Sequence, residues 1–454
     1  MVVKELPGDP ASSAARERTA IERLLQLDDP FAARLDDRGH EPPTWFERDG
    51  WRIFAPPAAS QDGVGDPVAS FSVADGSRAA LRYEKSSGSA LAPFDIGAAY
   101  DGYVFERWIE RTSNRRLSQR QLNAFYRVKP LIPRAAQVRA RRLLIRWQGL
   151  PRFPEWPIDQ SVARLVRFYA FCVLLAQGRT EASFRWFWPG SFRSAVVLTH
   201  DVESEEGLRL AVALADVEQE LGFRSSFNLG AWYRVDPGFL RELTSRGFEI
   251  GVHGLVHDRS LFASRQAFEA QQQGLGELIS RFDAHGFRSP ATHRVVPWLG
   301  ELPVEYDCSV PHSDPFEPQP GGCCSLWPFF IGPVVELPYT LPQDYSLFTL
   351  LGHRTPQLWI EQAERIEAEF GLIQCVSHPD PGYLGDPGNR ARYVEFLRAI
   401  ADRPRVWKAL PREVASWWRE RDASLGDPVS GTVHIGENPD DVVLDPPADQ
   451  VGSA

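Results

Sequence analysis

The sequence predicts an α/β fold in its C-terminal half, with parallel strands joined by helices, preceded by an N-terminal α+β region. From about residue 192, apolar runs of strand length alternate with amphipathic runs of helix length. This alternation is typical of parallel sheets with crossover helices, and hence of a barrel or a doubly wound sheet. Gly222 and Gly247 end two of the helical runs. Titratable residues gather where apolar runs end, which is where such folds carry their sites.

The N-terminal region, residues 1–190, contains no motif with recognisable chemistry. The stretch TAIERLLQL predicts a short amphipathic helix, and short runs broken by Gly, Ser and Pro between about 50 and 110 predict strands. An Arg-rich run ending near residue 148 and the periodic run 159–177 predict two more helices. We therefore expect an α+β region whose role is open.

Residues 191–423 are expected to form one domain, followed by a disordered tail. The predicted strands are AVVLTHD, RSSFNLG, FEIGVHG, LIQCVSH and RVWKA. The predicted helices cover 205–221, 237–247, 264–282, 355–370, 389–401 and 411–421, and a Pro-rich irregular stretch extends to Pro342. Residues 424–454 are acidic, rich in Gly and Pro and without periodicity, which predicts disorder.

Composition limits the partners and the location. A net charge of −10 without a concentrated Lys/Arg run argues against nucleic-acid binding. We interpret the basic stretch around Arg134, Arg139, Arg141 and Arg142 as the solvated face of a helix. The sequence has no apolar run of the roughly 18 residues that a transmembrane helix needs and no secretory pattern at its start. The cysteines, five in number and irregularly spaced, predict no disulfide framework. We expect a cytoplasmic protein of open oligomeric state.

A pair of histidines follows the predicted strand FEIGV. His253 and His257 are four residues apart in HGLVH. If the strand leads into a single helical turn, both imidazoles can face one cation, and neutral imidazole suits Zn²⁺. An isolated HxxxH pair often marks only a helix face, so the pair needs support from other elements.

Two further strand ends carry titratable residues. Asp201 and Glu203 follow the apolar run AVVL, where buried carboxylates need a compensating cation or proton. Capping of the following helix is the alternative use of these acids. His378 ends the apolar run before Pro379, where a histidine can act as a general acid near neutral pH. A hydrogen-bonded turn histidine is the alternative there.

Together and in this order, these elements resemble the polysaccharide deacetylase family, also called the NodB-homology or carbohydrate esterase family 4. THDVE looks like the family's first motif, usually TFDD, and EIGVHGLVH is similar to EIGSH-x-x-H. GFRSPATHR resembles the RxPY motif, and CVSHPD resembles the final L-x-H motif. The resemblance covers about Ser194–Trp418. It implies a distorted (β/α)7 barrel that removes N-acetyl or O-acetyl groups from sugar polymers.

Carried over to this sequence, the resemblance implies that His253 and His257 bind one divalent metal ion, with Zn²⁺ as the expected metal. Asp201 matches the general base. The position after the base usually supplies the third ligand, but Val202 stands there. Relatives with a D-x-D version point to Glu203 instead, and Asp201 itself is the alternative ligand.

The resemblance also implies roles for other residues. His378 matches the general acid, and Arg288 matches the arginine that orients the base. The acidic partner that tunes the acid has no clear match, and Asp307 and Asp314 are the candidates.

Several residues are expected to contact the substrate. Ala291, preceded by Pro290, stands where the family often has tyrosine, so that only its backbone N–H is left to hold an oxyanion. Trp327 lies in a Pro/Gly-rich segment and could stack on a sugar face. Further candidates near the expected mouth are Trp298, His293 and His312.

The sequence therefore predicts a metal-dependent deacetylase acting on an acetylated sugar or polysaccharide. A metal-bound water would attack the acetyl carbonyl, with Asp201 as base and His378 as acid. The D-x-E spacing and the missing tyrosine keep a second hypothesis open, hydrolysis of a cyclic imide or amide on the same fold. A third hypothesis is a non-catalytic carbohydrate-binding module, which would bind its ligand without metal.

Overall fold

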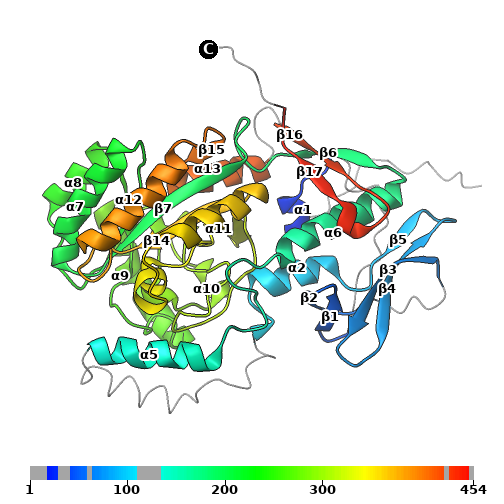
Figure 1. Ribbon diagram of the computed structural model, residues 1–454, viewed down its shortest axis with the longest axis horizontal. Coiled ribbons are helices and arrows are strands. Elements are labelled where there is room, and N and C mark those ends of the chain that lie inside the picture. The colour runs from blue at the N-terminus through cyan, green and yellow to red at the C-terminus, as the bar shows by residue number, and fades with distance from the viewer. Residues whose placement is uncertain (1–17, 29–40, 59–63, 110–133, 424–428, 449–454) are drawn as a thin grey trace, which may run out of the picture.

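The computed structural model describes residues 18–28, 41–58, 64–109, 134–423 and 429–448. An N-terminal antiparallel sheet lies at one end of the molecule and a larger parallel sheet with its helices at the other (Figure 1). The strands of the smaller sheet are β1 (Thr44–Arg48), β2 (Trp51–Ala55), β3 (Asp66–Val73), β4 (Arg78–Glu84) and β5 (Ser89–Leu91), in the order β2-β1-β3-β4-β5. The expected α+β character of this region is confirmed.

Helices cover the N-terminal sheet and build its core. They are α2 (Ile96–Val104) and α6 (Ser161–Gln177), while α1 (Ala20–Leu24) packs against α2, and the Arg-rich run forms α5 (Arg134–Gln148). Rings from the sheet and from α6 pack together, with Trp51 and Phe168 at 5.7 Å and Phe94 and Phe168 at 5.5 Å between ring centroids. Such aromatic packing supplies the main apolar burial of this part.

The parallel sheet is built from the strands that the sequence predicts together with short ones that it does not. They are β7 (Ser194–Val202), β8 (Ser226–Leu229), β9 (Glu249–Val252), β10 (Gly286–Phe287), β11 (Tyr306–Asp307), β13 (Val334–Glu336), β14 (Leu372–Ser377) and β15 (Val406–Lys408), with β12 (Phe329–Ile331) antiparallel to β13. The order is β12-β13-β11-β10-β9-β8-β7-β14, and β15 also pairs with β7. Every residue of β7 is buried, as expected for a central parallel strand.

Helices connect these strands on the outside of the sheet (Figure 1). They are α7 (Glu205–Glu220), α8 (Pro237–Ser245), α9 (Arg265–Phe282), α10 (Val296–Leu299), α11 (Gln357–Ala368), α12 (Pro387–Ala401) and α13 (Pro411–Asp422). Ser204 and Ser264 cap α7 and α9 by accepting from N–H groups of their first turns, which satisfies donors that a helix start otherwise leaves free.

The mixed α/β class is therefore confirmed, and the parallel strands form a strongly curled sheet. The backbone N–H groups of Thr340 and Leu341, just after β13, donate to the carbonyl of Gln374 in β14. Strand pairing itself does not join β13 to β14 within the described residues. Closure into a distorted (β/α)7 barrel thus stays a prediction.

The predicted disordered tail is wrong for most of its length. Residues 430–434 form β16 and residues 443–445 form β17, and these pair with β6 (Glu181–Arg185) in a three-stranded antiparallel sheet. Val433 and Leu444 face inward and are buried. The two strands are too short to produce a clear alternation of apolar and polar residues, so the acidic composition alone predicted disorder. The tail therefore packs on the N-terminal region.

The Pro-rich stretch is also more ordered than expected. It contains β11, β12 and β13, the 3₁₀ turn η3 (Pro290–Thr292) and, after Pro342, the π-helical turn η4 (Tyr345–Leu350). All five cysteines are free and buried, which confirms that no disulfide framework exists. Among the described residues, no helix combines the length and the apolar character needed to cross a bilayer.

Candidate metal centre

Three strand ends bring the predicted site residues together. Asp201 and Glu203 come from the end of β7, His253 follows β9, and His378 follows β14. These strands are parallel, with Asp201 in register with Asn228 of β8 and Asn228 in register with Gly251 of β9. Since parallel strands end at the same edge of a sheet, the side chains meet there.

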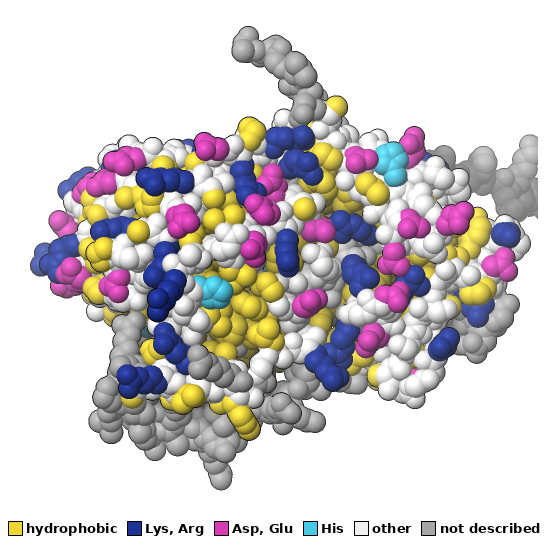
Figure 2. All heavy atoms as spheres, viewed as in Figure 1, with side chains coloured by type: hydrophobic (Ala, Val, Ile, Leu, Met, Phe, Trp, Pro, Cys, Tyr) yellow, Lys and Arg dark blue, Asp and Glu magenta, His cyan; other side chains and the backbone are white. Residues whose placement is uncertain are grey.

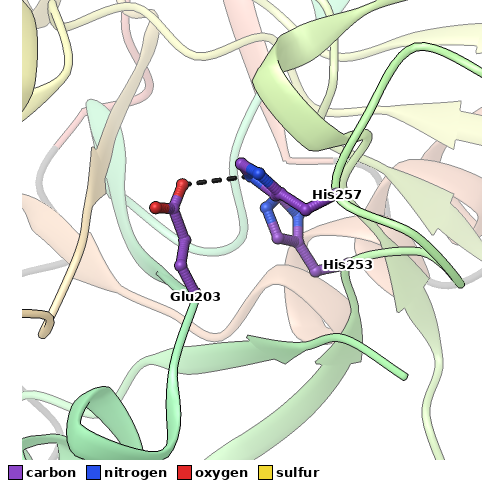
Figure 3. Close-up of side chains that lie close together, drawn as sticks. All are labelled: Glu203, His253 and His257. Atoms are coloured by element: carbon purple, nitrogen blue, oxygen red, sulfur yellow. Dashed lines mark ion pairs between the residues drawn. The ribbon is translucent and has the colours of Figure 1, made fainter. Parts of the chain in front are cut away.

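Glu203, His253 and His257 form a compact group of potential ligands. One ligand atom from each lies within 4.8 Å of the other two. Nε2 of His257 is 3.1 Å from Oε1 of Glu203, and the two imidazole centroids are 5.4 Å apart. Figure 3 shows both rings on one side of a gap, with the Glu203 carboxylate on the other. Two imidazoles and one carboxylate at this spacing fit a single divalent cation.

The tautomer of His253 suits a metal ligand. Its Nδ1 lies 2.9 Å from the backbone carbonyl of Arg288. Because a carbonyl accepts only, Nδ1 must carry the hydrogen, and the lone pair is left on Nε2. Burial lowers the pKa of His253 to about 4, so the ring is neutral over the ordinary pH range. Neutral imidazole is the form that binds metals.

The connection between the two histidines differs from the predicted helical turn. Residues 255–259 form bends rather than a helix. Gly254 has φ +99°, and a Cβ there would lie 3.2 Å from Cγ of Pro290. Only glycine takes up this conformation without strain. The positive-φ turn after β9, not a helix, brings His257 back toward His253.

Two contacts hold the backbone at Glu203. Its N–H donates to Oδ2 of Asp380 at 2.9 Å, and its carbonyl accepts from the indole N–H of Trp232 at 3.0 Å. Burial would raise the pKa of the Glu203 carboxyl, but the hydrogen bond with His257 and the charge of His378 lower it to about 2. Glu203 is therefore an anion positioned toward both histidines.

Asp201 lies beside this group and is not part of it. Its side chain is 3% exposed, and Oδ1 accepts from Nδ2 of Asn228 at 2.8 Å. Burial would raise the pKa of Asp201, yet the interactions with His253, Arg288 and His378 and the hydrogen bond from Asn228 bring it below its usual value. The group of three potential ligands contains Glu203 and not Asp201. This geometry favours Glu203 over Asp201 as the acidic ligand.

Arg288 is fully buried behind Asp201. Its Nη2 donates to Oγ1 of Thr199 at 3.1 Å. Its Nε and Nη1 have no hydrogen-bond partner among the described residues. The guanidinium thus acts on Asp201 through its charge rather than through a direct hydrogen bond.

His378 has an acidic partner that the sequence did not indicate. Nδ1 of His378 is 2.7 Å from Oδ1 of Asp344, and the backbone N–H of His378 donates to Oδ2 at 3.0 Å. The two sequence candidates bond elsewhere: Asp307 accepts from Ser309, and Asp314 accepts from the N–H of Phe316. The sequence pattern does not indicate Asp344, because this residue precedes a turn in an irregular stretch without periodicity.

Two aromatic rings lie beside the histidines of the candidate metal centre. Trp232 lies 5.7 Å from His253 and 5.1 Å from His257 between ring centroids, and Tyr383 lies 4.6 Å from His378. Both rings are half-buried. Sequence reasoning missed them, although Trp232 closely follows β8 and Tyr383 follows β14, which are strand-end positions.

Trp327 is wrongly predicted as a substrate contact. It is 1% exposed, stacks on Phe187 at 5.2 Å, and donates its indole N–H to the carbonyl of Phe370. His312 is equally buried, with Nδ1 beside the carbonyl of Ser325 and Nε2 accepting from the N–H of Asp159. Both side chains serve packing, because their polar atoms are already satisfied inside the protein.

Of the other predicted contacts, Pro290 is buried and the rest are half-buried. Pro290 is buried against the turn at Gly254, and the half-buried Ala291 has φ 49° and ψ 29° in η3. His293 is half-buried, and burial lowers its pKa to about 4. Trp298 is half-buried against Phe268 at 5.4 Å.

Several solved structures of other proteins resemble part of this chain. No protein-family model and no curated protein matches the chain. A candidate polysaccharide deacetylase from Mycobacterium smegmatis is 21% identical over 54% of this chain and 96% of its own, with a TM-score of 0.43. A family 4 carbohydrate esterase from Streptomyces lividans, in complex with acetate, is 11% identical over 48% of this chain and 93% of its own, with a TM-score of 0.32.

An allantoinase, PuuE, is 16% identical over 51% of this chain and 92% of its own, with a TM-score of 0.40. TM-scores this low support no conclusion about the activity of this chain. Polysaccharide deacetylases and family 4 carbohydrate esterases recur among the solved structures that this chain resembles.

Proposed function

We propose that the chain is a metal-dependent hydrolase that removes an acetyl group from an N-acetylated or O-acetylated sugar or polysaccharide. The observation that carries the proposal is the placement of Asp201 and the His378–Asp344 pair beside the three potential ligands. A general base, a general acid and a cation site in one place are what hydrolysis of an amide or ester requires. The motif resemblance selects the acetylated sugar as the substrate.

The residues present fit a divalent cation such as Zn²⁺. Two imidazoles and the Glu203 carboxylate are a donor set that Zn²⁺ accepts in catalytic sites, where a further position stays open. The N–H at Nδ1 of His253, held by the carbonyl of Arg288, fixes the donor atom. When bound, such a cation supplies Lewis-acid polarisation of the carbonyl and lowers the pKa of a neighbouring water.

Asp201 is proposed as the general base. Its carboxylate is kept ionised by the surrounding positive charges, and Asn228 fixes one of its oxygens. An ionised, oriented carboxylate can accept a proton from water as that water attacks the acetyl carbonyl. Arg288 is proposed to stabilise and position this carboxylate through its buried charge.

His378 is proposed as the general acid. Burial opposes its protonation, but the Asp344 carboxylate raises its pKa to about 10. The imidazolium is therefore present at neutral pH and can deliver its proton to the leaving nitrogen or oxygen. The backbone N–H of Ala291, next to Pro290, is proposed to hold the developing oxyanion, a contact worth about 3 kcal/mol.

An acetate-release assay tests this proposal. The purified chain would be given N-acetylglucosamine oligomers, O-acetylated xylan and a cyclic imide, each with chelator and with added Zn²⁺. We expect acetate from an acetylated sugar, loss with chelator, recovery with Zn²⁺, and nearly no turnover by Asp201→Asn. Ring opening of the imide without acetate release would support the second hypothesis instead. Sugar binding that needs no metal, with no turnover, would support the binding module.

A further inference from the structure

The helix α5 differs in charge from the rest of the chain. Its sequence, RAAQVRARRLLIRWQ, contains five arginines and no acidic residue. The whole chain carries a net charge of −10. Moreover, no Asp or Glu occurs in the sequence between Glu110 and Glu155. The helix therefore carries a concentration of positive charge in a sequence that is otherwise strongly acidic.

The same helix exposes large apolar side chains. Leu143 is 66% exposed, Leu144 48% and Trp147 83%, and Leu150 just beyond the helix is 53% exposed. They are four of the seven large hydrophobic side chains that are exposed in the described part of the chain. A concentration of this kind marks an interaction surface rather than ordinary surface variation.

The opposite side of α5 attaches it to the larger domain. Val138, Arg141 and Ile145 are half-buried at helical spacing. Arg141 donates to the carbonyl of Phe316, and Nε of Arg142 donates to the carbonyl of Thr349 in η4 at 2.9 Å. The helix is thus held in place with its apolar residues outward. Figure 1 places α5 along the lower edge of the larger domain, and Figure 2 shows basic and hydrophobic side chains next to one another along that edge.

We propose that α5 docks the protein onto an anionic lipid surface. Arginines flanking exposed Leu and Trp side chains are the composition of helices that lie in the interface of a bilayer, with apolar groups among the acyl chains and cations at the headgroups. An anionic polymer would satisfy the arginines but leave Leu143, Trp147 and Leu150 in water. A purely apolar partner would leave the positive charge of the helix uncompensated. An anionic bilayer satisfies both.

The docking surface lies close to the candidate site and does not depend on its activity. Thr349, which accepts from Arg142, belongs to η4, and Asp344, the partner of His378, caps the start of the same turn. Docking would therefore bring the mouth of the site near the membrane surface.

Vesicle flotation of the full chain tests the proposal. The vesicles are phosphatidylcholine alone, or phosphatidylcholine with an equal share of phosphatidylglycerol. We expect binding to the anionic vesicles only, decreasing as salt is raised because screening weakens the attraction. Arg139→Gln, at an exposed position of α5, should weaken binding about fivefold, as expected for one cation near such a surface. Leu143→Ser/Trp147→Ser should weaken it at least tenfold.

Matched controls are Arg209→Gln in α7 and Val443→Ser in β17, which are exposed positions away from α5. Both should bind as the wild-type protein does. Circular dichroism and elution volume would show that every variant keeps its fold and its association state. Absence of binding to anionic vesicles would overturn the proposal, as would binding that the α5 variants do not change. Equal binding to soluble polyphosphate, insensitive to Leu143→Ser/Trp147→Ser, would identify a polyanion surface instead.

Discussion

Oδ1 of Asp344 lies 2.7 Å from Nδ1 of His378, and Oδ2 accepts the backbone N–H of the same histidine. One carboxylate therefore controls both the charge and the orientation of the imidazole. Against the effect of burial, the Asp344 charge raises the pKa of His378 to about 10. The opposite ring nitrogen, Nε2, lies 3.9 Å from Oε1 of Glu203 and so faces the candidate metal centre.

We predict that Asp344→Asn lowers kcat about 100-fold, the smaller end of the range for loss of a general acid. Without the carboxylate the pKa of His378 falls, so the imidazole loses its proton at lower pH. The alkaline limb of the pH–rate profile should move toward neutral pH, and a profile of kcat between pH 6 and 11 would show it. Asp236→Asn, which neutralises a carboxylate at the start of α8 instead, should leave the profile unchanged. Superimposable profiles for Asp344→Asn and wild type would contradict the role.

A second prediction concerns the hydrogen bond from Asn228 to Asp201. Asn228→Ala removes a donor to an ionised carboxylate, and such a bond contributes roughly 1.5 kcal/mol or more, so kcat should fall about tenfold. Because the bond favours the charged form, its loss raises the pKa of Asp201. The acid limb of the rate profile should then move to higher pH, while the metal content stays unchanged. The control variant Asn438→Ala should leave the acid limb where it is in wild type. An acid limb that Asn228→Ala also leaves unshifted would count against Asp201 as base.

Stability should depend on pH through Glu249, which lies at the start of β9, at the other end of that strand from His253. Burial raises the pKa of Glu249 to about 7, although Tyr306 donates to its Oε1 at 2.7 Å. Between pH 4.5 and 7 the folded state keeps this proton while the unfolded state releases it, so the free energy of unfolding falls as pH rises.

Glu249→Gln should remove this dependence. The difference in the free energy of unfolding, variant minus wild type, should increase by about 3 kcal/mol between pH 4.5 and pH 8, at roughly 1.4 kcal/mol per pH unit. Urea unfolding at several pH values measures it, with the exposed Glu277→Gln as control. A difference that stays constant with pH would contradict the assignment.

The N-terminal region and the larger domain are joined by a buried ion pair. Nε and Nη2 of Arg294 donate to the two oxygens of Glu106 at 2.8 and 2.5 Å, and both side chains are almost fully buried. Arg294→Met leaves the carboxylate unpaired and should lower the free energy of unfolding by about 3–5 kcal/mol.

The double variant Glu106→Gln/Arg294→Met should recover part of that loss, because no uncompensated charge remains. Arg265→Met, which breaks an exposed pair with Glu301, should have a much smaller effect. Equal losses at the buried and the exposed pair, measured by urea unfolding, would show that the buried pair has no special structural role.

The sequence predicted the strand ends well because their apolar runs and following titratable residues are local patterns. His253, Asp201, Glu203 and His378 lie at or just after the predicted strand ends, whereas His257 lies in a bend and not in the predicted helical turn. The proposal of Glu203 rather than Asp201 as the acidic ligand rests on the structure, in which a Glu203 oxygen lies within 4.8 Å of both imidazoles. The expected cytoplasmic location stays a prediction.

The residues that the sequence missed or misplaced depend on tertiary contacts. Asp344 lies 34 positions before His378 in a stretch without periodicity. The Pro and Gly residues around Trp327 predict an exposed loop, but the chain there passes through the core. Strands β16 and β17 are short, and their pairing with β6 stabilises them where local propensity does not.

Bound zinc per chain, measured by mass spectrometry after dialysis against trace Zn²⁺, tests the central claim most directly. We predict one zinc ion for wild type and for Asp201→Asn, which should be nearly inactive. His253→Ala, His257→Ala and Glu203→Gln should each lose the metal, whereas His285→Ala, at a histidine that pairs with Glu305 instead, should retain it. Zinc retained by the double variant His253→Ala/His257→Ala, or wild type that binds none, would contradict the account.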